Sequence, residues 1–403
     1  MSEPSSGRLM SLDVFRGATI AAMMLVNNPG TWADIYPPLR HAAWHGWTIT
    51  DLIFPYFLWI VGMAMTLSFA KRIERGDDKK KLFVHVGRRA VIIFLLGIFL
   101  TGFPKLFPYF DFSVLSYIRI PGVLQRIAVC YLIASAIFLW SGVRGQIIWT
   151  VGLLVVYWLM MMLIPVPGFG AGNLTMEGNF SHYIDSILLN GHMWTATKTW
   201  DPEGTISTLP AIATTMFGIL TGHLLRSKMS PGDKTAWMFV MGNLLIVAGT
   251  IMDFWMPINK NIWSASYSVF IAGMATVMFA VCYWIIDVQG YKNWSKPLAI
   301  YGMNAITVFV LSGILGRLVS IITWTESIGR TTFVNSPEWL VSIITWIAGT
   351  SGKEITLKGW MYSRFFVPLG SPMNVSLYFA LAWVLMLYGI AYFMYKRNWF
   401  LKV

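Results

Sequence analysis

The chain has 403 residues, of which 56% are hydrophobic and only 12% are charged. Soluble domains carry about 25% charged residues, so this composition excludes a soluble enzyme, a disordered protein and an ordinary nucleic-acid-binding domain. Apolar stretches of about 18–24 residues recur along the whole sequence, and each is long enough to cross a bilayer as a helix. The sequence therefore predicts an all-α polytopic membrane protein.

The net charge is +12, from 30 Lys and Arg residues against 18 Asp and Glu residues. In a membrane protein the positive-inside rule explains such an excess, and no nucleic-acid partner is needed. Cys130 and Cys282 each lie inside an apolar run, with neither disulfide nor metal spacing. We therefore expect no metal site, and a lipid bilayer around most of the chain.

Ten predicted spans follow the apolar stretches in chain order. They cover residues 9–28, 48–70, 88–103, 119–140, 147–164, 208–225, 235–255, 263–286, 298–317 and 374–395. A shorter apolar segment at 339–347 predicts an interfacial or re-entrant helix near the C-terminal end. With the N-terminus in the cytoplasm, most Lys and Arg residues fall on the cytoplasmic side, so both termini are expected there. The chain then forms a single transmembrane domain, 1–403, with an extracytoplasmic loop at 165–207.

The first span carries polar groups that are costly inside a bilayer and are therefore candidates for function. Asp13 and Arg16 are three residues apart on one helix face and can form an ion pair, for which a membrane-surface anchor is the plainer interpretation. Asn27 follows Arg16 on nearly the same face, about 16 Å further along the axis. One face thus holds a cation suited to phosphate and an amide, separated by about the length of an extended phosphopantetheine arm.

The connection between the first two spans contains His41 at the membrane boundary, where an imidazole can act as a base near neutral pH. A structural role is the alternative, as for most single histidines. Thr48 and Asp51 have the form of a capping box at the start of the second span, so Asp51 suits either capping or orienting a histidine. His41 and His45 are spaced as zinc ligands, but neither a third ligand nor an HExxH motif accompanies them.

Other polar residues carry weaker signals. Arg126 lies about two turns inside the fourth span, where its guanidinium needs a partner such as Asp51 or an anionic ligand. Asn304 lies near the cytoplasmic end of the ninth span. The external segments combine aromatic rings with polar groups, which suits carbohydrate binding as well as an interfacial aromatic belt. These external candidates are Trp44, Asp201, Glu203, Lys260, Asn261 and Trp263.

Seven motifs in a fixed order make the chain resemble the heparan-α-glucosaminide N-acetyltransferase family. They are SLDVFRG, VNN, RHAAWHGWTITDLIFPYFLWIVG, RIPGVLQR, WDPEGTIST, PINKNIWSASY and YGMNA. The resemblance extends over essentially the whole chain and is strongest to the bacterial, NagX-type members of these transmembrane acyltransferases. His45 stands where the family has an asparagine.

The resemblance implies transmembrane N-acetylation. Acetyl-CoA is expected to bind from the cytoplasm, and its acetyl group to pass to the amine of a glucosamine-type sugar at the extracytoplasmic face. The family's essential histidine and asparagine match His41 and Asn27, and Asp51 is expected to orient the imidazole. The predicted cofactor-binding residues are Asp13, Arg16, Arg126 and Asn304. The predicted substrate-binding residues are the six external candidates named above.

Two alternatives stay open at the level of the sequence. His41 acts either as a general base or as a transient acetyl carrier. The alternative function is a membrane transporter for N-acetylglucosamine or related amino sugars, although such a carrier has no use for a phosphate-binding Arg16. The expected location is the bacterial cytoplasmic (inner) membrane, and the sequence is compatible with a homodimer.

Overall fold

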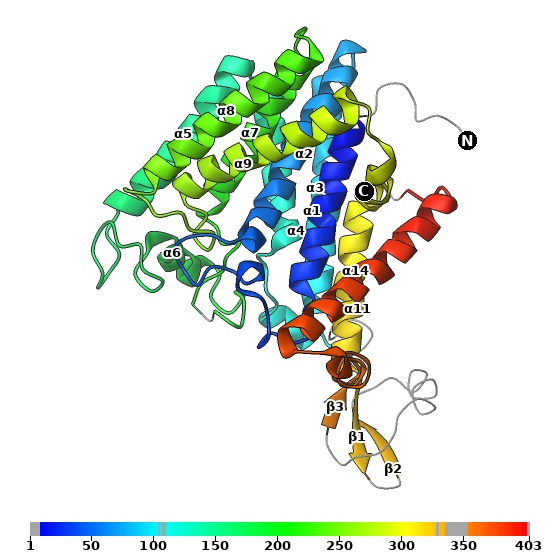
Figure 1. Cartoon of the computed structure of the whole chain (residues 1–403). Coiled ribbons are helices and arrows are strands. Elements are labelled where there is room, and N and C mark those ends of the chain that lie inside the picture. The colour runs from blue at the N-terminus through cyan, green and yellow to red at the C-terminus, as the bar shows by residue number, and fades with distance from the viewer. Residues whose placement is uncertain are drawn as a thin grey trace.

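The structure is a computed structural model that describes residues 9–103, 105, 110–197, 199–327, 330–334 and 354–400. Helices make up most of these residues and confirm the predicted all-α polytopic class (Figure 1). The long helices are α1 (Met10–Asn27), α2 (Ile49–Glu74), α3 (Lys79–Gly102), α4 (Val123–Trp140), α5 (Val143–Leu163), α7 (Thr208–Arg226), α8 (Pro231–Met252), α9 (Ala265–Tyr283), α11 (Ala305–Ile321) and α14 (Pro372–Lys396). The short α-helices are α6 (Phe180–Leu188), α10 (Lys296–Met303) and α13 (Leu357–Met361).

Among the described residues, eight helices are long and apolar enough to cross a membrane. They are α2, α3, α4, α5, α7, α8, α14 and α9 with its π-helical continuation Trp284–Val288. The pair formed by Asn293–Met303 and Ala305–Ile321 is bent by 68° and makes a ninth if it is counted as one span. The remaining predicted span is α1, which packs against α2, α10 and α14. Each of the ten predicted spans therefore coincides with a helix or with the bent pair.

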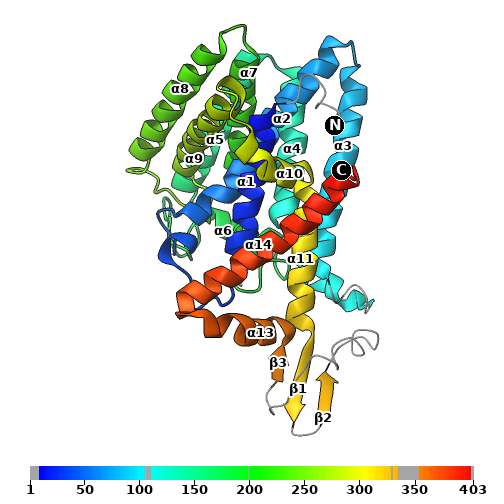
Figure 2. The ribbon, with the colours of Figure 1, turned by 45° about the vertical axis from the view of Figure 1, so that its right-hand side comes forward.

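A small antiparallel sheet follows α11, and the sequence analysis did not predict it. Its strands are β1 (Thr323–Ser327), β2 (Arg330–Val334) and β3 (Glu354–Thr356), in the order β2-β1-β3. The interfacial helix predicted at 339–347 falls outside the described residues. Beyond the sheet, α13 continues into a π turn at Tyr362–Phe366 and a 3-10 turn at Val367–Leu369, and α14 then crosses α11 diagonally (Figure 2).

Glycines allow several helix pairs to approach backbone to backbone. A Cβ atom on Gly17 of α1 would lie 1.8 Å from the carbonyl oxygen of Leu298 in α10. A Cβ atom on Gly218 of α7 would lie 2.0 Å from the carbonyl oxygen of Trp59 in α2. Small residues at helix contacts are the usual means of tight packing in membranes, where burial of apolar surface does not drive association.

The connections between helices gather at two ends of the bundle. One end, which we call the loop end, holds the connections 28–48, 164–207 with α6, and 253–264, together with the small sheet (Figure 1). The other end, which we call the opposite end, holds the start of α1 and the links from α2 to α3 and from α7 to α8. The three loop-end connections contain most of the residues predicted to function.

Candidate active site

His41 and Asp51 form a hydrogen-bonded pair at the loop end. The Nδ1 atom of His41 lies 2.6 Å from Oδ1 of Asp51, whose side chain is 1% exposed while that of His41 is 46% exposed. The backbone amides of Ala42 and Thr48 donate to the other carboxylate oxygen, each over 3.0 Å. A carboxylate accepts but does not donate when ionised, so Nδ1 carries the proton and Nε2 is the basic nitrogen. Asp51 thus caps α2 and orients His41 at once, and the two functions predicted as alternatives coexist.

The turn before α9 holds the His41 loop from one side. The Gly46 amide donates to the carbonyl of Ile258 over 2.7 Å, and the side-chain amide of Asn259 lies 3.3 Å from Nδ1 of His45. Asn259 is fully buried, and the sequence analysis did not single it out. Burial lowers the pKa of His45 despite the opposing charge of Asp253, so this imidazole favours the neutral form. Asn259 therefore helps to hold the loop that contains His41.

Two aromatic rings of the connection 164–207 contact Trp44 of the same loop. His182 of α6 stacks on Trp200 with ring centres 4.6 Å apart, and Trp44 meets both rings edge-on. The indole nitrogen of Trp44 also donates to the carbonyl of Leu174 over 3.0 Å. Burial lowers the pKa of His182 to about 4, so it packs as a neutral ring. The connection 164–207 and the segment around His41 are thus joined through Trp44.

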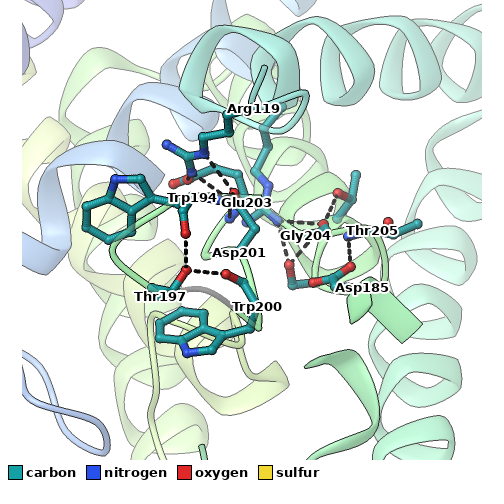
Figure 3. A network of polar contacts seen from close by, with 12 residues as sticks. Arg119, Asp185, Trp194, Thr197, Trp200, Asp201, Glu203, Gly204 and Thr205 are labelled. Carbon is teal, nitrogen blue, oxygen red and sulfur yellow. Dashed lines mark hydrogen bonds and ion pairs between the residues drawn. The ribbon is translucent and has the colours of Figure 1, made fainter. Parts of the chain in front are cut away.

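Arg119 anchors the WDPEG segment, as Figure 3 shows. It binds the carboxylate of Asp201 with two hydrogen bonds of 2.7 and 2.6 Å and also pairs with Glu203. Burial alone would raise the pKa of Glu203, but Arg119 and Lys260 hold it below its ordinary value. Both carboxylates, predicted to bind substrate, are therefore engaged with Arg119, a partner that the sequence analysis did not identify.

Arg126 is placed differently from the prediction. Its side chain is buried at the loop end and donates to the carbonyl of Gly204 over 2.9 Å and to the hydroxyl of Ser207 over 2.5 Å. Its guanidinium lies 5.0 Å from the ring centre of Trp263. Its hydrogen-bond partners are thus the last residue of WDPEG and a serine three positions later, and Asp51, the partner suggested by the sequence, is not among them in the described part of the chain. Arg126 supports the loop end and lies apart from the predicted phosphate-binding Arg16.

The turn residues predicted to bind substrate differ in exposure. Lys260 and Asn261 are half-buried, whereas Trp263 has no exposed surface. The Trp263 ring packs on Phe54 and Tyr267, and its indole nitrogen donates to Thr214 over 3.2 Å. Trp263 therefore supports the site from beneath, and Lys260 and Asn261 keep surface for a ligand.

Two polar cavities lie along α1. The outer one, of about 370 Å³, is lined by the end of α1 with Asn27 and Asn28, and by parts of α3, α4, α11, α13 and α14. The inner one, of about 780 Å³, contains Arg16 and Asn304. Among the described residues that line the two cavities, His41 does not appear. Arg16 and Asn27, predicted to lie on one face, thus belong to different cavities of the same helix.

A narrow apolar waist separates these cavities. It is a pocket of about 10 Å³ lined by Ile20, Met23, Phe57, Val123, Leu124, Ile127, Ala305, Ile306 and Phe309. It shares Val123, Leu124 and Phe309 with the outer cavity, and it shares Phe57, Ile127, Ala305 and Ile306 with the inner one. The three pockets therefore follow one another through the bundle.

The inner cavity is rich in basic groups. Arg16 is joined there by His85, Arg88 and Arg89 of α3, and no Asp or Glu occurs among its described lining residues. The ion pair predicted between Arg16 and Asp13 is present at 3.2 Å. The spacing of residues 85, 88, 89 and 92 on one helix face is a signal that the sequence analysis missed, because it counted these residues only toward topology.

The helix break at Asn304 opens toward the same inner cavity. The amide nitrogen of Asn304 donates to the carbonyl of Trp399 over 3.2 Å, and its buried oxygen has no hydrogen-bond partner among the described residues. Because α11 starts at Ala305, and Ala305 and Ile306 line this cavity, the N-terminus of a 17-residue helix lies beside it. Interrupted membrane helices are tolerated where the free backbone groups line a cavity, and a helix N-terminus favours anions.

Fold and site together define a polytopic membrane protein with a His–Asp pair at one end and two polar cavities joined at an apolar waist. In the described part of the chain, no three His, Cys, Asp or Glu side chains are grouped as metal ligands. The family model described as heparan-alpha-glucosaminide N-acetyltransferase, catalytic, matches residues 8–249. The chain belongs to this family, which confirms the resemblance found in its motifs.

Two relatives carry the name heparan-alpha-glucosaminide N-acetyltransferase. The mouse protein is 29% identical to this chain, with 76% of this chain and 53% of the mouse protein covered. The human protein is also 29% identical, with 75% of this chain and 52% of the human protein covered. The chain therefore spans about half the length of the curated relatives it matches.

Proposed function

We propose that this protein transfers the acetyl group of acetyl-CoA to the amine of a glucosamine-type sugar at the loop end. The observation that supports it most is the succession of a basic inner cavity, an apolar waist and an outer cavity containing Asn27. The family relationship gives the reaction class. The excess of Lys and Arg on the side of the termini supports an orientation with the inner cavity in contact with the cytoplasm and the loop end outside.

The inner cavity suits the phosphate-bearing part of CoA. Its volume of about 780 Å³ is within the range of about 300–1,000 Å³ typical of small-molecule sites. Arg16, Arg88 and Arg89 offer charge-assisted hydrogen bonds to phosphate oxygens, and the first amides of α11 add a favourable dipole. The Nε atom of Arg89 is buried and has no partner among the described residues, which leaves a donor for such a ligand.

The waist suits the thin pantetheine arm. Arg16 and Asn27 are eleven residues apart on α1, a rise of about 16 Å. An arm that starts at the inner cavity and passes Ile20 and Phe309 brings the thioester to the Asn27 amide. That amide donates to the thioester oxygen as negative charge develops on it.

His41 and Asp51 provide the acid–base chemistry. The ammonium group of the sugar loses its proton to Nε2 of His41, and the free amine attacks the thioester carbon. The new C–N bond forms, the C–S bond breaks, and the departing thiolate of CoA takes up a proton. Asp51 holds the proton on Nδ1 and stabilises the imidazolium that forms. The acceptor enters at the loop end, where Lys260 and Asn261 keep accessible surface.

Purified protein supplied with radiolabelled acetyl-CoA and glucosamine tests this function. We expect labelled N-acetylglucosamine from the wild type and a loss of at least about 100-fold in the His41→Ala variant. His223→Ala is the control, because that histidine pairs with Gln146 in another part of the bundle. Equal rates for His41→Ala and wild type, or no product from the wild type, would refute the proposal.

Mass spectrometry after incubation with acetyl-CoA alone separates the two functions predicted for His41. A general base leaves the protein mass unchanged. An acetylated protein that is absent in the His41→Ala variant would instead show that His41 carries the acetyl group.

A further inference from the structure

The outer cavity contains two cations that the proposed chemistry does not use. Arg317 of α11 and Lys358 of α13 line it together with Asn27. Both side chains are half-buried. Arg119 lines the cavity as well, but Asp201 and Glu203 already neutralise its charge.

Neither cation has an acidic partner within the described residues. Arg317 donates to the carbonyl of Gly313 in its own helix over 3.0 Å, and Lys358 lies over the ring of Phe379 at 5.6 Å. Burial lowers the pKa of Lys358 below its ordinary value, since no carboxylate compensates for the loss of water. A half-buried cation without a counter-charge is costly, so two of them facing one cavity favour an anionic occupant.

The rest of the lining is built to recognise a polar ligand. The amide nitrogen of Gln125 is buried and has no hydrogen-bond partner in the described part of the chain. Asn28 and Trp383 both donate to the hydroxyl of Ser312, over 3.4 and 3.0 Å, which fixes polar groups on the cavity wall. No Asp or Glu occurs among the described lining residues. The cavity thus offers a ligand two positive charges and the amide donor of Gln125. Its described lining has no carboxylate that would repel an anion.

We propose that Arg317 and Lys358 bind an acidic substituent of the acceptor, so that the preferred substrate is an amino sugar bearing a carboxylate or a sulfate. This inference rests on the proposed acetyl transfer. The cavity volume of about 370 Å³ is near the lower limit of about 300 Å³ for small-molecule sites, which suits a single sugar unit with its substituent. A guanidinium binds both acid groups through paired hydrogen bonds, and Asn27 in the same cavity lies where the thioester arrives.

The test compares acceptors at saturating acetyl-CoA. Glucosamine is the acceptor without an acid group, muramic acid carries a carboxylate, and glucosamine 6-sulfate carries a sulfate. We expect kcat/KM for at least one acidic acceptor to exceed that for glucosamine by about 10-fold, which corresponds to one charge-assisted contact. In Arg317→Gln and Lys358→Gln this ratio falls to about one. Arg317→Lys keeps part of the preference because it keeps the charge.

Arg144→Gln is the matched control, because Arg144 is an exposed cation in the first turn of α5 and lines neither cavity in the described structure. We expect Arg144→Gln to keep the wild-type ratio of kcat/KM for an acidic acceptor to kcat/KM for glucosamine. Thermal stabilisation by acetyl-CoA shows that each variant is folded. Equal kcat/KM for all three acceptors in the wild type would overturn the inference while leaving acetyl transfer intact. A rise in the KM for acetyl-CoA in the two Gln variants would also overturn it, because the cavity would then hold a donor phosphate.

A binding measurement separates failure of this inference from failure of the proposed function. If no acceptor is acetylated, the proposed function fails, and thermal stabilisation by muramic acid or glucosamine 6-sulfate still tests the cavity. Stabilisation of the wild type, but not of the Gln variants, supports the acidic-sugar site. Stabilisation by phosphatidylglycerol alone, again lost in the variants, would assign the cavity to a lipid headgroup and contradict the inference.

Discussion

Asp51 both caps a helix and holds His41 through a single carboxylate. One oxygen holds His41, and the other accepts from the backbone at the start of α2. We predict that Asp51→Asn lowers kcat by at least about 100-fold, because the amide no longer fixes the proton on Nδ1. Initial-rate kinetics with acetyl-CoA and glucosamine measure this loss.

Thr48→Ala is the control for Asp51, because it removes the hydroxyl of the same capping box but keeps the His41 contact. It should cost about 0.5–2 kcal/mol in stability and leave kcat within a few-fold. If Thr48→Ala lost as much activity as Asp51→Asn, the loss of helix capping alone would explain the effect of replacing the Asp51 carboxylate.

Asp185 gives the loop end a specific dependence on pH. Burial raises the pKa of this carboxyl to about 6 from an ordinary value of 3.8. The folded state therefore binds the proton more tightly than the unfolded state, and protonation of Asp185 stabilises the fold. This contribution to stability is complete below about pH 4 and is lost as the pH rises through about 6. The difference between the two pKa values corresponds to about 3 kcal/mol in the free energy of unfolding.

We predict that the melting temperature of the wild type falls relative to Asp185→Asn as the pH rises from 4 to 7, because the neutral amide cannot ionise. Thermal unfolding in one detergent across this range measures the difference. Glu177→Gln, in the same loop but exposed, should run parallel to the wild type. Parallel curves for wild type and Asp185→Asn would contradict the role of burial.

Individual residues were predictable from sequence where the partner is close in the chain. Asp13 and Arg16 pair at helical spacing, and Thr48 and Asp51 form the capping box. The partners of Arg126 are 78 and 81 positions away, and no local pattern indicates that Gly204 and Ser207 approach it. Such contacts depend on how the helices and loops pack.

At the scale of elements, the close packing of α2 and α7 gives the first prediction. A Cβ atom on Gly218 would lie 2.0 Å from the carbonyl oxygen of Trp59, so α2 and α7 must separate to accommodate it. We predict that Gly218→Ala destabilises the protein by about 1–3 kcal/mol. Gly152→Ala, in α5 with open space around it, should be neutral or slightly stabilising. Thermal unfolding of both variants checks this, and equal melting temperatures would contradict the close packing of α2 and α7.

The apolar waist gives a second prediction for elements. Val123 lines both the waist and the outer cavity, so Val123→Trp should fill the passage. We expect acetyl-CoA to keep stabilising the variant, because the proposed site for its phosphates is the inner cavity, while acetyl transfer falls by at least about 100-fold from misplacement of the thioester. Val123→Ala is the control and keeps the passage open. Normal turnover by a folded Val123→Trp would show that the acetyl group takes another route.

Hydropathy predicted the elements well because the bilayer demands long apolar helices, and each predicted span has its helix. The break at Asn304 was not predicted, since neither proline nor a polar run marks it in the stretch 298–317. The small sheet was also not predicted, because hydropathy identifies long membrane helices and carries little signal for short strands. The break at Asn304 is accompanied by a tertiary contact, the hydrogen bond from Asn304 to Trp399.

At the scale of the whole molecule, we propose that donor and acceptor bind on opposite sides of the membrane. The inner cavity and the loop end lie along one helix, and the apolar waist lies between the two cavities and shares lining residues with both. A sugar transporter would move the sugar itself, whereas the proposed enzyme moves only an acetyl group. The two functions therefore differ in which molecule crosses the bilayer.

The most direct test uses proteoliposomes with glucosamine enclosed and acetyl-labelled acetyl-CoA added outside. We predict that labelled N-acetylglucosamine forms inside, that CoA stays outside, and that vesicles containing the His41→Ala variant form none. Passage of glucosamine or N-acetylglucosamine across the membrane without acetyl-CoA, or absence of labelled product in the lumen of wild-type vesicles, would contradict transmembrane acetyl transfer.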